Sequence, residues 1–552
     1  MNMKRHDILP TSESKRRSSL EPPNECDIAI IGAGSGGLMA GALLALRGFR
    51  VAVFDHHYVA GGCTTQFARG SSRERYLFDV GLHYVGECEP DGMMNRLLSA
   101  AKVYPQWVPM DQDGFDILEF PDFTFPIPAG LDAFRERLVS FFPSERRGID
   151  RYFRFVRDVQ RISQRISKAG ERLKLSARLW ALFIARSLVR YQYASIADVL
   201  DDCTRNPELR AVLVGQNGDY GLPPSEVSAL LHAGLVTHYL NGAWYPKGGG
   251  QVTSDLLAKQ IEENGGSIHL RCGVARILVE QGRAVGIETE KVKGTQYQVR
   301  AKAVLSNADI RATLVDLVSP EYVPKNLIQR ADQLSWATGI FMTYLGVRGS
   351  MAERGMRRAN YWQFDSYDIE SCYRVAAQAD RPIVNSAYIT SASLKDPETP
   401  HHAPDGVESV EIMGLLPWSD RIWGLSDGEL KSGAYRKNPE YLSRKQALEQ
   451  DLIARLERQF PGTINNISFR ESATPVTHAR YTRATNGSAY GIAATPDQFS
   501  EKRPGYRTPI EKLYLCGAST RAGHGIIGAF RSGYASARRI AADFDRPLDP
   551  LA

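Results

Sequence analysis

Three glycines and one aspartate stand where a chain can bind the phosphates and the sugar of a dinucleotide. Gly32, Gly34 and Gly37 have the spacing G-x-G-x-x-G, and Asp55 follows about twenty residues later. The first glycine permits a tight turn, the second lets backbone N–H groups approach a pyrophosphate, and the third lets a helix pack closely on a strand. The pyrophosphate then lies at the helix N-terminus, and a carboxylate at position 55 can accept hydrogen bonds from ribose hydroxyls.

A strand, a helix and a second strand are needed to position these residues, and the sequence predicts all three. Residues 27–31 (DIAII) form a short apolar run typical of a buried strand, and residues 51–54 (VAVF) form another that ends directly before the aspartate. Small residues at 40–42 suit a helix packed between them. Ser35 and Gly36 complete the turn at the start of this helix. The stretch therefore predicts a complete nucleotide-binding unit.

A second glycine turn extends this unit. Gly61 and Gly62 follow the second strand and let the backbone come close to a cofactor beyond the first unit, which favours FAD over NAD. Cys63 comes next. We include it among the cofactor-binding candidates, and a small packing residue is the alternative interpretation.

The composition excludes several classes of protein. The chain has 552 residues, 43% of them hydrophobic and 24% charged, which is typical of a globular protein of two domains or one elaborated domain. No apolar run reaches the roughly 18 residues of a membrane-spanning helix. A net charge of +6 without a long basic run gives no nucleic-acid footprint. The seven cysteines form no C-x-x-C pair, so we expect neither a disulfide framework nor a metal site.

The order of the predicted elements implies domains that are interleaved along the chain. Residues 1–24 are polar and basic, and we expect a disordered tail and a cytoplasmic protein. From 91 to 240 the pattern is mostly helical, whereas a helix at 253–264 and strands at 267–270, 274–279, 284–288 and 297–305 resume an α/β pattern. We therefore predict an α/β fold in which a Rossmann-type FAD-binding domain (25–100, 241–310 and 505–548) is interleaved with a mixed α+β substrate-binding or cap domain (101–240 and 311–504).

Several longer segments resemble one family of flavoproteins. They are FDVGLHYVG (78–86), YGLPPSEVSALLHAGLVTHYLNGAWYPKGGG (220–250), SNAD (306–309), ASLKDP (392–397), GSAYG (487–491) and LYLCGAS (513–519). With the glycine turns, they make the chain similar to the retinol saturase branch of the FAD-dependent phytoene desaturases and carotenoid isomerases. The resemblance implies an amine-oxidase-like FAD fold and a polyene or isoprenoid lipid substrate. It departs from the pattern at Asp55, where glutamate is more usual, and in the segment 517–529, which looks closer to the carotenoid enzymes.

The resemblance also implies further site residues. It places the last strand and helix against the flavin, so Gly517, Gly528 and Ala529 join the cofactor-binding candidates, with the backbone N–H groups of the last two polarising the flavin O2. Val274, at the start of a strand, is included with them. Saturation of a C=C bond takes a hydride from reduced flavin and a proton from the protein. We favour His83, Tyr84 and His238 as proton donors, and the alternative for each is a hydrogen-bonded core residue.

The sequence leaves other interpretations open. Saturation, desaturation and redox-neutral isomerisation share one flavin site, and NAD(P)H would act as an external reductant because the chain has no second G-x-G-x-x-G. An amine oxidase is another possibility on the same fold. A lipid-carrying chaperone of the GDP-dissociation-inhibitor type is an alternative of another class, although such carriers lose the glycines that are present here. The basic amphipathic stretch 172–190 suits either a peripheral membrane contact or an ordinary cap helix.

Overall fold

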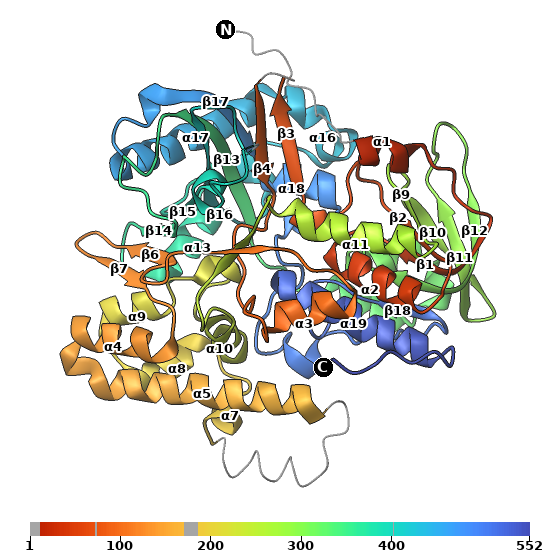
Figure 1. Ribbon diagram of the computed structural model, residues 1–552, viewed down its shortest axis with the longest axis horizontal. Helices are drawn as coiled ribbons and strands as arrows, with labels where there is room; N and C mark the ends of the chain where they lie inside the picture. The colour runs from red at the N-terminus through yellow and green to blue at the C-terminus, as the bar shows by residue number, and fades with distance from the viewer. Residues whose placement is uncertain (1–11, 72–73, 170–185, 401, 552) are drawn as a thin grey trace.

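The first of two large sheets has the Rossmann arrangement. The computed structural model describes residues 12–71, 74–169, 186–400 and 402–551 (Figure 1). The strand order in this sheet is β10-β11-β12-β1-β2-β9, and β18 pairs with the end of β12. Its strands are β1 (Glu25–Ile31), β2 (Val51–Phe54), β9 (Ser267–His269), β10 (Val274–Glu280), β11 (Arg283–Thr289), β12 (Gln298–Ser306) and β18 (Leu513–Leu515). Three separate stretches of sequence therefore build one sheet.

The centre of this sheet is parallel and covered by helices. β12, β1, β2 and β9 pair in parallel, whereas β10, β11 and β12 form an antiparallel meander. All four residues of β2 are buried, as expected for a parallel strand with both faces covered. The helices α2 (Ser35–Leu46), α11 (Gln251–Glu263) and α19 (Gly525–Ala542) pack together beside it, with α3 (Met93–Ala100) against α19 (Figure 1). The prediction of an α/β fold with a Rossmann-type domain is confirmed.

The second large sheet is mostly antiparallel and has the order β17-β13-β16-β15-β14-β6-β7. Only the β14–β6 pair is parallel. Its strands are β6 (Asp116–Glu119), β7 (Thr124–Ile127), β13 (Gly339–Arg348), β14 (Asn360–Phe364), β15 (Ser386–Thr390), β16 (Val407–Leu416) and β17 (Ile467–Ala473). Among the described residues, β3 (Gln66–Gly70) and β4 (Arg75–Asp79) form a hairpin, and β5 (Trp107–Pro109) pairs antiparallel with the distant β8 (Trp244–Pro246).

Helices flank this second sheet, and most of them lie at its β6–β7 end. These are α4 (Leu131–Phe141), α5 (Arg146–Ala169), α7 (Arg186–Tyr191), α8 (Ile196–Cys203), α9 (Pro207–Leu213) and α10 (Ala229–His238) (Figure 1). The expectation of a mostly helical stretch from 91 to 240 misses β5, β6 and β7, because these strands are only three or four residues long and show no readable alternation. The longer helices elsewhere are α12 (Lys325–Asp332), α13 (Ile369–Gln378), α17 (Pro439–Gln459) and α18 (Pro475–Thr482).

Part of the N-terminal segment that we expected to be a disordered tail is ordered. Ser12–Ser19 form the helix α1, and Arg17, only 3% exposed, pairs with Glu262 of α11 at 3.0 Å. The local composition predicts disorder here because it does not reveal that an ion pair holds the segment against a distant helix.

Most of the amphipathic stretch 172–190 lies outside the described residues, and only its end, in α7, is described. Among the described residues, no helix is long and apolar enough to cross a membrane.

Candidate cofactor and substrate site

The first glycine turn is packed so tightly that side chains larger than hydrogen do not fit. Gly32 has φ of 95°, and a Cβ atom on Gly37 would lie 2.2 Å from the Gly32 carbonyl oxygen. A Cβ on Gly36 would lie 2.6 Å from Asn307 Oδ1, at the end of β12. The N–H groups in the first turn of α2 have no partner within the helix. This turn is therefore suited to bind a pyrophosphate.

The second glycine turn lies directly against the first. The Gly61 N–H donates to the Ala33 carbonyl at 2.7 Å, and a Cβ on Gly62 would lie 3.0 Å from Gly34 Cα. The short 3₁₀ helix Gly62–Thr64 that follows is tied to α2 by Ser35 Oγ and Thr64 Oγ1, which are 3.0 Å apart. The two turns thus form one cradle.

Asp55 holds the polypeptide at the end of β2. Its Oδ2 accepts the Ala33 N–H at 2.7 Å, and its Oδ1 accepts the His57 N–H at 2.8 Å. Burial opposes ionisation, but hydrogen bonding and charge from His56, with these two N–H groups, hold the pKa of Asp55 below its usual value. A carboxylate has about four lone-pair sites, so acceptor capacity remains for the ribose hydroxyls that the sequence predicts.

The start of α19 closes the cradle from the C-terminal end of the chain. A Cβ on Gly517 would lie 2.8 Å from Asn307 Oδ1, and one on Gly528 would lie 2.7 Å from the Ala522 carbonyl oxygen. The helix begins at Gly525, so its free N–H groups belong to residues 525–527, and those of Gly528 and Ala529 fall within the hydrogen-bonded helix. The N–H groups that are free to polarise the flavin O2 are therefore those of residues 525–527, and the expectation for Gly528 and Ala529 is corrected accordingly.

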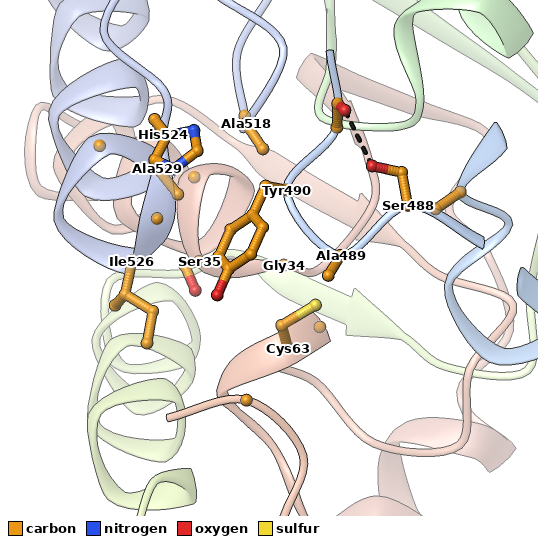
Figure 2. Close-up of a pocket in the computed structure, with 18 of the residues that line it drawn as sticks. Gly34, Ser35, Cys63, Ser488, Ala489, Tyr490, Ala518, His524, Ile526 and Ala529 are labelled. Carbon is orange, nitrogen blue, oxygen red and sulfur yellow. Dashed lines mark hydrogen bonds between the residues drawn. The ribbon is translucent and has the colours of Figure 1, made fainter. Parts of the chain in front are cut away.

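One cavity of about 2450 Å³ runs along all these elements. It is lined by Gly32, Gly34, Ser35, Gly36, Asp55, Gly62, Cys63, Val274, Gly517, Gly528 and Ala529 from the predicted cofactor residues, and by His83, Tyr84 and His238 from the predicted proton donors. Gly37 and Gly61 stand behind this lining and serve the close packing described above. Figure 2 shows Tyr490 between Cys63 and the start of α19. Its ring stacks on that of His524, with the ring centroids 5.1 Å apart.

Buried polar atoms without partners gather at this end of the cavity. Among the described residues, His524 Nδ1 and both Nε and Nη1 of Arg503 have no hydrogen-bond partner, although each is buried. Arg503 is 2% exposed, and burial lowers its pKa to about 10. Buried donors and acceptors are normally paired. A bound group rich in oxygen and nitrogen, such as a flavin nucleotide, would satisfy them, so the residues fit FAD.

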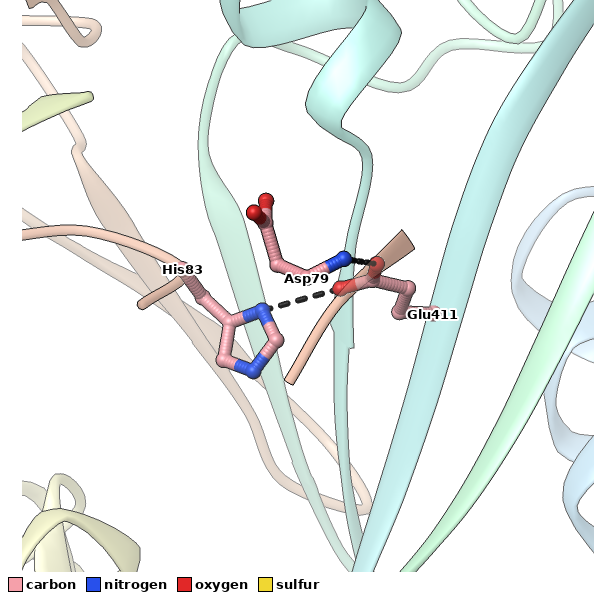
Figure 3. A group of neighbouring side chains, drawn as sticks. All are labelled: Asp79, His83 and Glu411. Atoms are coloured by element: carbon pink, nitrogen blue, oxygen red, sulfur yellow. Dashed lines mark hydrogen bonds and ion pairs between the residues drawn. The ribbon is translucent and has the colours of Figure 1, made fainter. Parts of the chain in front are cut away.

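His83 belongs to a buried group of charged side chains. Its Nδ1 lies 2.8 Å from Glu411 Oε2, and Glu411 Oε1 accepts the Asp79 N–H at 2.8 Å. The ligand atoms of the three side chains lie within 4.8 Å of one another, close enough for a metal ion (Figure 3). Lys395, however, is also buried there and donates to the His83 carbonyl and to Thr390 Oγ1. Its ammonium group supplies the positive charge, which favours a charge-balanced network over a metal site.

Tyr84 lies at the wall of the cavity between two carboxyl groups. Its ring stacks on that of Tyr239 with centroids 4.5 Å apart, and its hydroxyl contacts Asp116 and Asp219. Sequence reasoning did not identify either aspartate, nor Glu411 or Lys395. The only available signals were the position of Asp219 beside the matched segment 220–250 and that of Lys395 within ASLKDP.

His238 is differently placed, because both its ring nitrogens are engaged within the protein. Nε2 accepts the Gly86 N–H at 2.9 Å, and Nδ1 lies 3.2 Å from Glu87 Oε2. A ring that accepts at Nε2 and donates at Nδ1 is a neutral tautomer whose one N–H is already used. This geometry gives His238 a positioning role in the segment 84–87, and we do not assign proton donation to it.

Comparison with known proteins agrees with this geometry. The sequence model of the family described as flavin containing amine oxidoreductase matches residues 35–541. The all-trans-retinol 13,14-reductase of Danio rerio is 28% identical over 527 residues, which cover 90% of this chain and 82% of the relative. The chloroplastic prolycopene isomerase of Daucus carota is 24% identical over 553 residues, covering 96% of this chain and 82% of the relative.

Solved structures with the same fold include two oxidoreductases. Putrescine oxidase bound to putrescine has a TM-score of 0.60 and 15% identity, and covers 94% of this chain and 100% of that one. An oxidoreductase from Methanosarcina mazei has a TM-score of 0.59 and 17% identity, with 92% and 99% covered. At this identity the likeness establishes the fold alone.

Proposed function

Because this chain belongs to the flavin containing amine oxidoreductase family and is an FAD-dependent oxidoreductase, we propose that it acts on the C=C bonds of a long polyene or isoprenoid lipid. The reaction that we propose is saturation, of the kind named in the retinol 13,14-reductases. Desaturation and redox-neutral isomerisation, the reaction named in the prolycopene isomerases, are the alternatives at the same site.

The size and continuity of the cavity carry this proposal. Its volume of about 2450 Å³ is more than twice the roughly 300–1,000 Å³ of a common small-molecule pocket. It extends from the glycine cradle past Tyr84 to apolar residues of the cap, among them Val159, Leu230 and Leu235. A dinucleotide bound in the cradle therefore leaves the part of the cavity beside these residues, here called the apolar arm, free for a second, elongated molecule.

We assign the cofactor to the cradle residue by residue. Its site consists of Gly32, Gly34, Ser35, Gly36, Gly37, Asp55, Gly61, Gly62, Cys63, Val274, Gly517, Gly528 and Ala529, with the free N–H groups of residues 525–527. FAD, when bound, supplies the hydride chemistry. The chain orients the lipid in the apolar arm, excludes water, and provides a proton at the wall that carries His83 and Tyr84. Burial raises the pKa of Cys63 to about 11, so this residue contributes a neutral thiol there.

A lipid carrier of the GDP-dissociation-inhibitor type is the alternative from another class. Such a carrier needs the apolar arm but not the cradle. Gly36, Gly37 and Gly62 allow the close backbone contacts that form the cradle, and a carrier without a cofactor has no use for such a cradle, which favours the enzyme.

The test is to purify the protein, record its visible spectrum and identify the co-purified lipid by mass spectrometry. We expect a flavin spectrum and a polyene or isoprenoid lipid. A colourless protein that takes up no FAD would remove the enzyme and leave the carrier. Anaerobic addition of NADPH tests whether a diffusing nicotinamide cofactor reduces the flavin.

The membrane contact and the cytoplasmic location expected from the sequence remain part of the proposal. Flotation of the protein with vesicles that contain anionic lipid tests the contact, and recovery of all protein in the unbound fraction would contradict it.

A further inference from the structure

The Tyr84 hydroxyl is shared between the carboxyl group of Asp116, which is buried, and that of Asp219, which is half-buried. Its oxygen lies 2.6 Å from Asp219 Oδ2 and 3.1 Å from Asp116 Oδ2. A phenol carries one hydrogen and can therefore donate to only one of these oxygens. If both carboxyl groups were ionised, the second contact would bring lone pairs together without a hydrogen between them. One of the two contacts therefore uses a hydrogen that belongs to a carboxyl group.

The surroundings decide which carboxyl group carries this hydrogen. Asp116 accepts hydrogen bonds from Asn360 Nδ2 at 2.9 Å and from Gln216 Nε2 at 2.6 Å, and these donors favour its ionised form. Among the described residues, Tyr84 is the hydrogen-bond partner of the Asp219 carboxyl. Burial and the charge of Asp116 raise the pKa of Asp219 well above its usual value, whereas burial raises the pKa of Asp116 only to about 6.

The protonated group is also the one that faces the site. Asp219 ends the short 3₁₀ helix Asn217–Asp219, and it lines the cavity together with Tyr84. Its backbone carbonyl accepts a hydrogen bond from His524 Nε2 at 3.2 Å. His524 is the residue directly before α19, beside the cofactor cradle (Figure 2). The acid is thus fixed between the start of α19 and the aromatic wall of the cavity.

We propose that Asp219 is a neutral carboxylic acid that donates the proton to the substrate carbon, and that Tyr84 and Asp116 position it. This inference rests on the proposed function for its substrate. In saturation, one carbon of the double bond receives a hydride and its neighbour receives the Asp219 proton. The hydride and its two electrons derive from a reduced nicotinamide dinucleotide, which leaves oxidised, and a proton from bulk solvent reprotonates Asp219 after the product has left.

The same contacts stabilise the carboxylate after the transfer. Once Asp219 is ionised, the Tyr84 hydroxyl can turn its hydrogen from Asp116 to Asp219, where it makes a strong charge-assisted bond. Asn360 and Gln216 continue to donate to Asp116 during this exchange. One rotation of a hydroxyl therefore accompanies the loss and the return of the proton.

Infrared spectroscopy tests the protonation without any substrate. In FAD-loaded protein at pH 8, Asp219→Asn should remove a carbonyl band of a protonated carboxylic acid from the spectrum. Asp396→Asn is the matched control, because Asp396 is buried, yet bonds from His402, Thr399 and the Gly248 N–H hold its pKa at about 2 despite that burial. Its replacement should leave the protonated-acid bands in place. If Asp219→Asn keeps every protonated-acid band of the wild type, the proposal is refuted.

Kinetics test the role of the proton. General acids contribute roughly a hundred- to ten-thousandfold, so we expect a loss of this size in polyene turnover for Asp219→Asn, with FAD content and flavin reduction by NADPH unchanged. Tyr84→Phe should lose about tenfold to a hundredfold. Tyr514→Phe, which removes a hydroxyl bonded to Asp543 Oδ2 on a side chain that does not line the cavity, is the control for loss of a tyrosine hydroxyl and should keep wild-type turnover.

The outcomes separate this inference from the proposed function. Wild-type turnover in a folded, FAD-loaded Asp219→Asn variant would refute the acid and leave the proposed function intact. Loss of the infrared band in a protein that converts no polyene would support the neutral acid and refute the proposed substrate.

Discussion

Replacement of Gly62 by alanine probes the contact between the two glycine turns. Gly62 has φ of 60°, and an added Cβ would lie 3.0 Å from Gly34 Cα. Carbon atoms that are not bonded rest about 3.5–4.0 Å apart, so the turns must separate by about 0.5–1 Å. This change widens the cradle at the point where we propose that the pyrophosphate binds.

The expected effect is a weaker affinity for FAD. Loss of one hydrogen bond to a charged group costs about 1.5–3 kcal/mol, which corresponds to roughly a tenfold to 150-fold higher Kd. The left-handed backbone adds about 1–2 kcal/mol of strain in the folded protein. Gly265→Ala controls for this strain, because Gly265 has φ of 82° and an added Cβ there meets nothing within 4 Å.

Titration of the FAD-free proteins with FAD, followed by flavin fluorescence, gives the three dissociation constants. We expect Gly62→Ala to bind FAD at least tenfold more weakly than Gly265→Ala, and Gly265→Ala to match the wild type. Equal affinity in all three proteins would refute the assignment of the paired turns to the cofactor.

Three further predictions follow from the charged and polar groups of the site. The pKa of Asp55 is lowered in the folded protein, so its carboxylate stabilises the fold above the ordinary carboxyl pKa and stops doing so as the pH falls through the pKa of the folded state. FAD retention, measured by fluorescence, should therefore depend less on pH at the acidic end in Asp55→Asn than in the wild type. Burial lowers the pKa of Lys395 from 10.5 to about 8, so the free energy of unfolding should rise by up to about 3 kcal/mol as the pH rises from 8 to 10.5. Denaturant unfolding at both ends of this range should show that rise in the wild type and not in Lys395→Met, and a rise of equal size in the variant would contradict it. His238→Gln should change turnover by less than about tenfold if the ring only positions the segment 84–87, whereas a loss as large as that of Asp219→Asn would restore His238 as a proton donor.

The cofactor cradle could be predicted from the sequence because its parts are local. Gly32, Gly34, Gly37 and Asp55 belong to one strand–helix–strand unit with a characteristic spacing, and Gly61 and Gly62 follow it directly along the chain. Even so, the position of the free N–H groups at α19 required the structure, because a shift of one helical turn separates residues 525–527 from Gly528 and Ala529.

The acidic and basic partners of the proton-donor candidates could not be predicted, since long-range folding brings them together. Tyr84 meets Asp219 across 135 residues, and the His83 carbonyl meets Lys395 across 312. A single sequence contains the residue types but not the register of the second sheet, where β6, β14 and β16 contribute Asp116, Asn360 and Glu411.

A single anaerobic turnover shows whether the reduced flavin of this protein saturates a polyene. The FAD-loaded protein is reduced, freed of excess reductant and mixed with a polyene such as all-trans-retinol or a carotenoid, while the flavin spectrum and the mass of the lipid are followed. We expect reoxidation of the flavin together with a lipid that has gained two hydrogen atoms. A flavin that stays reduced while every polyene tested is recovered unchanged would contradict it.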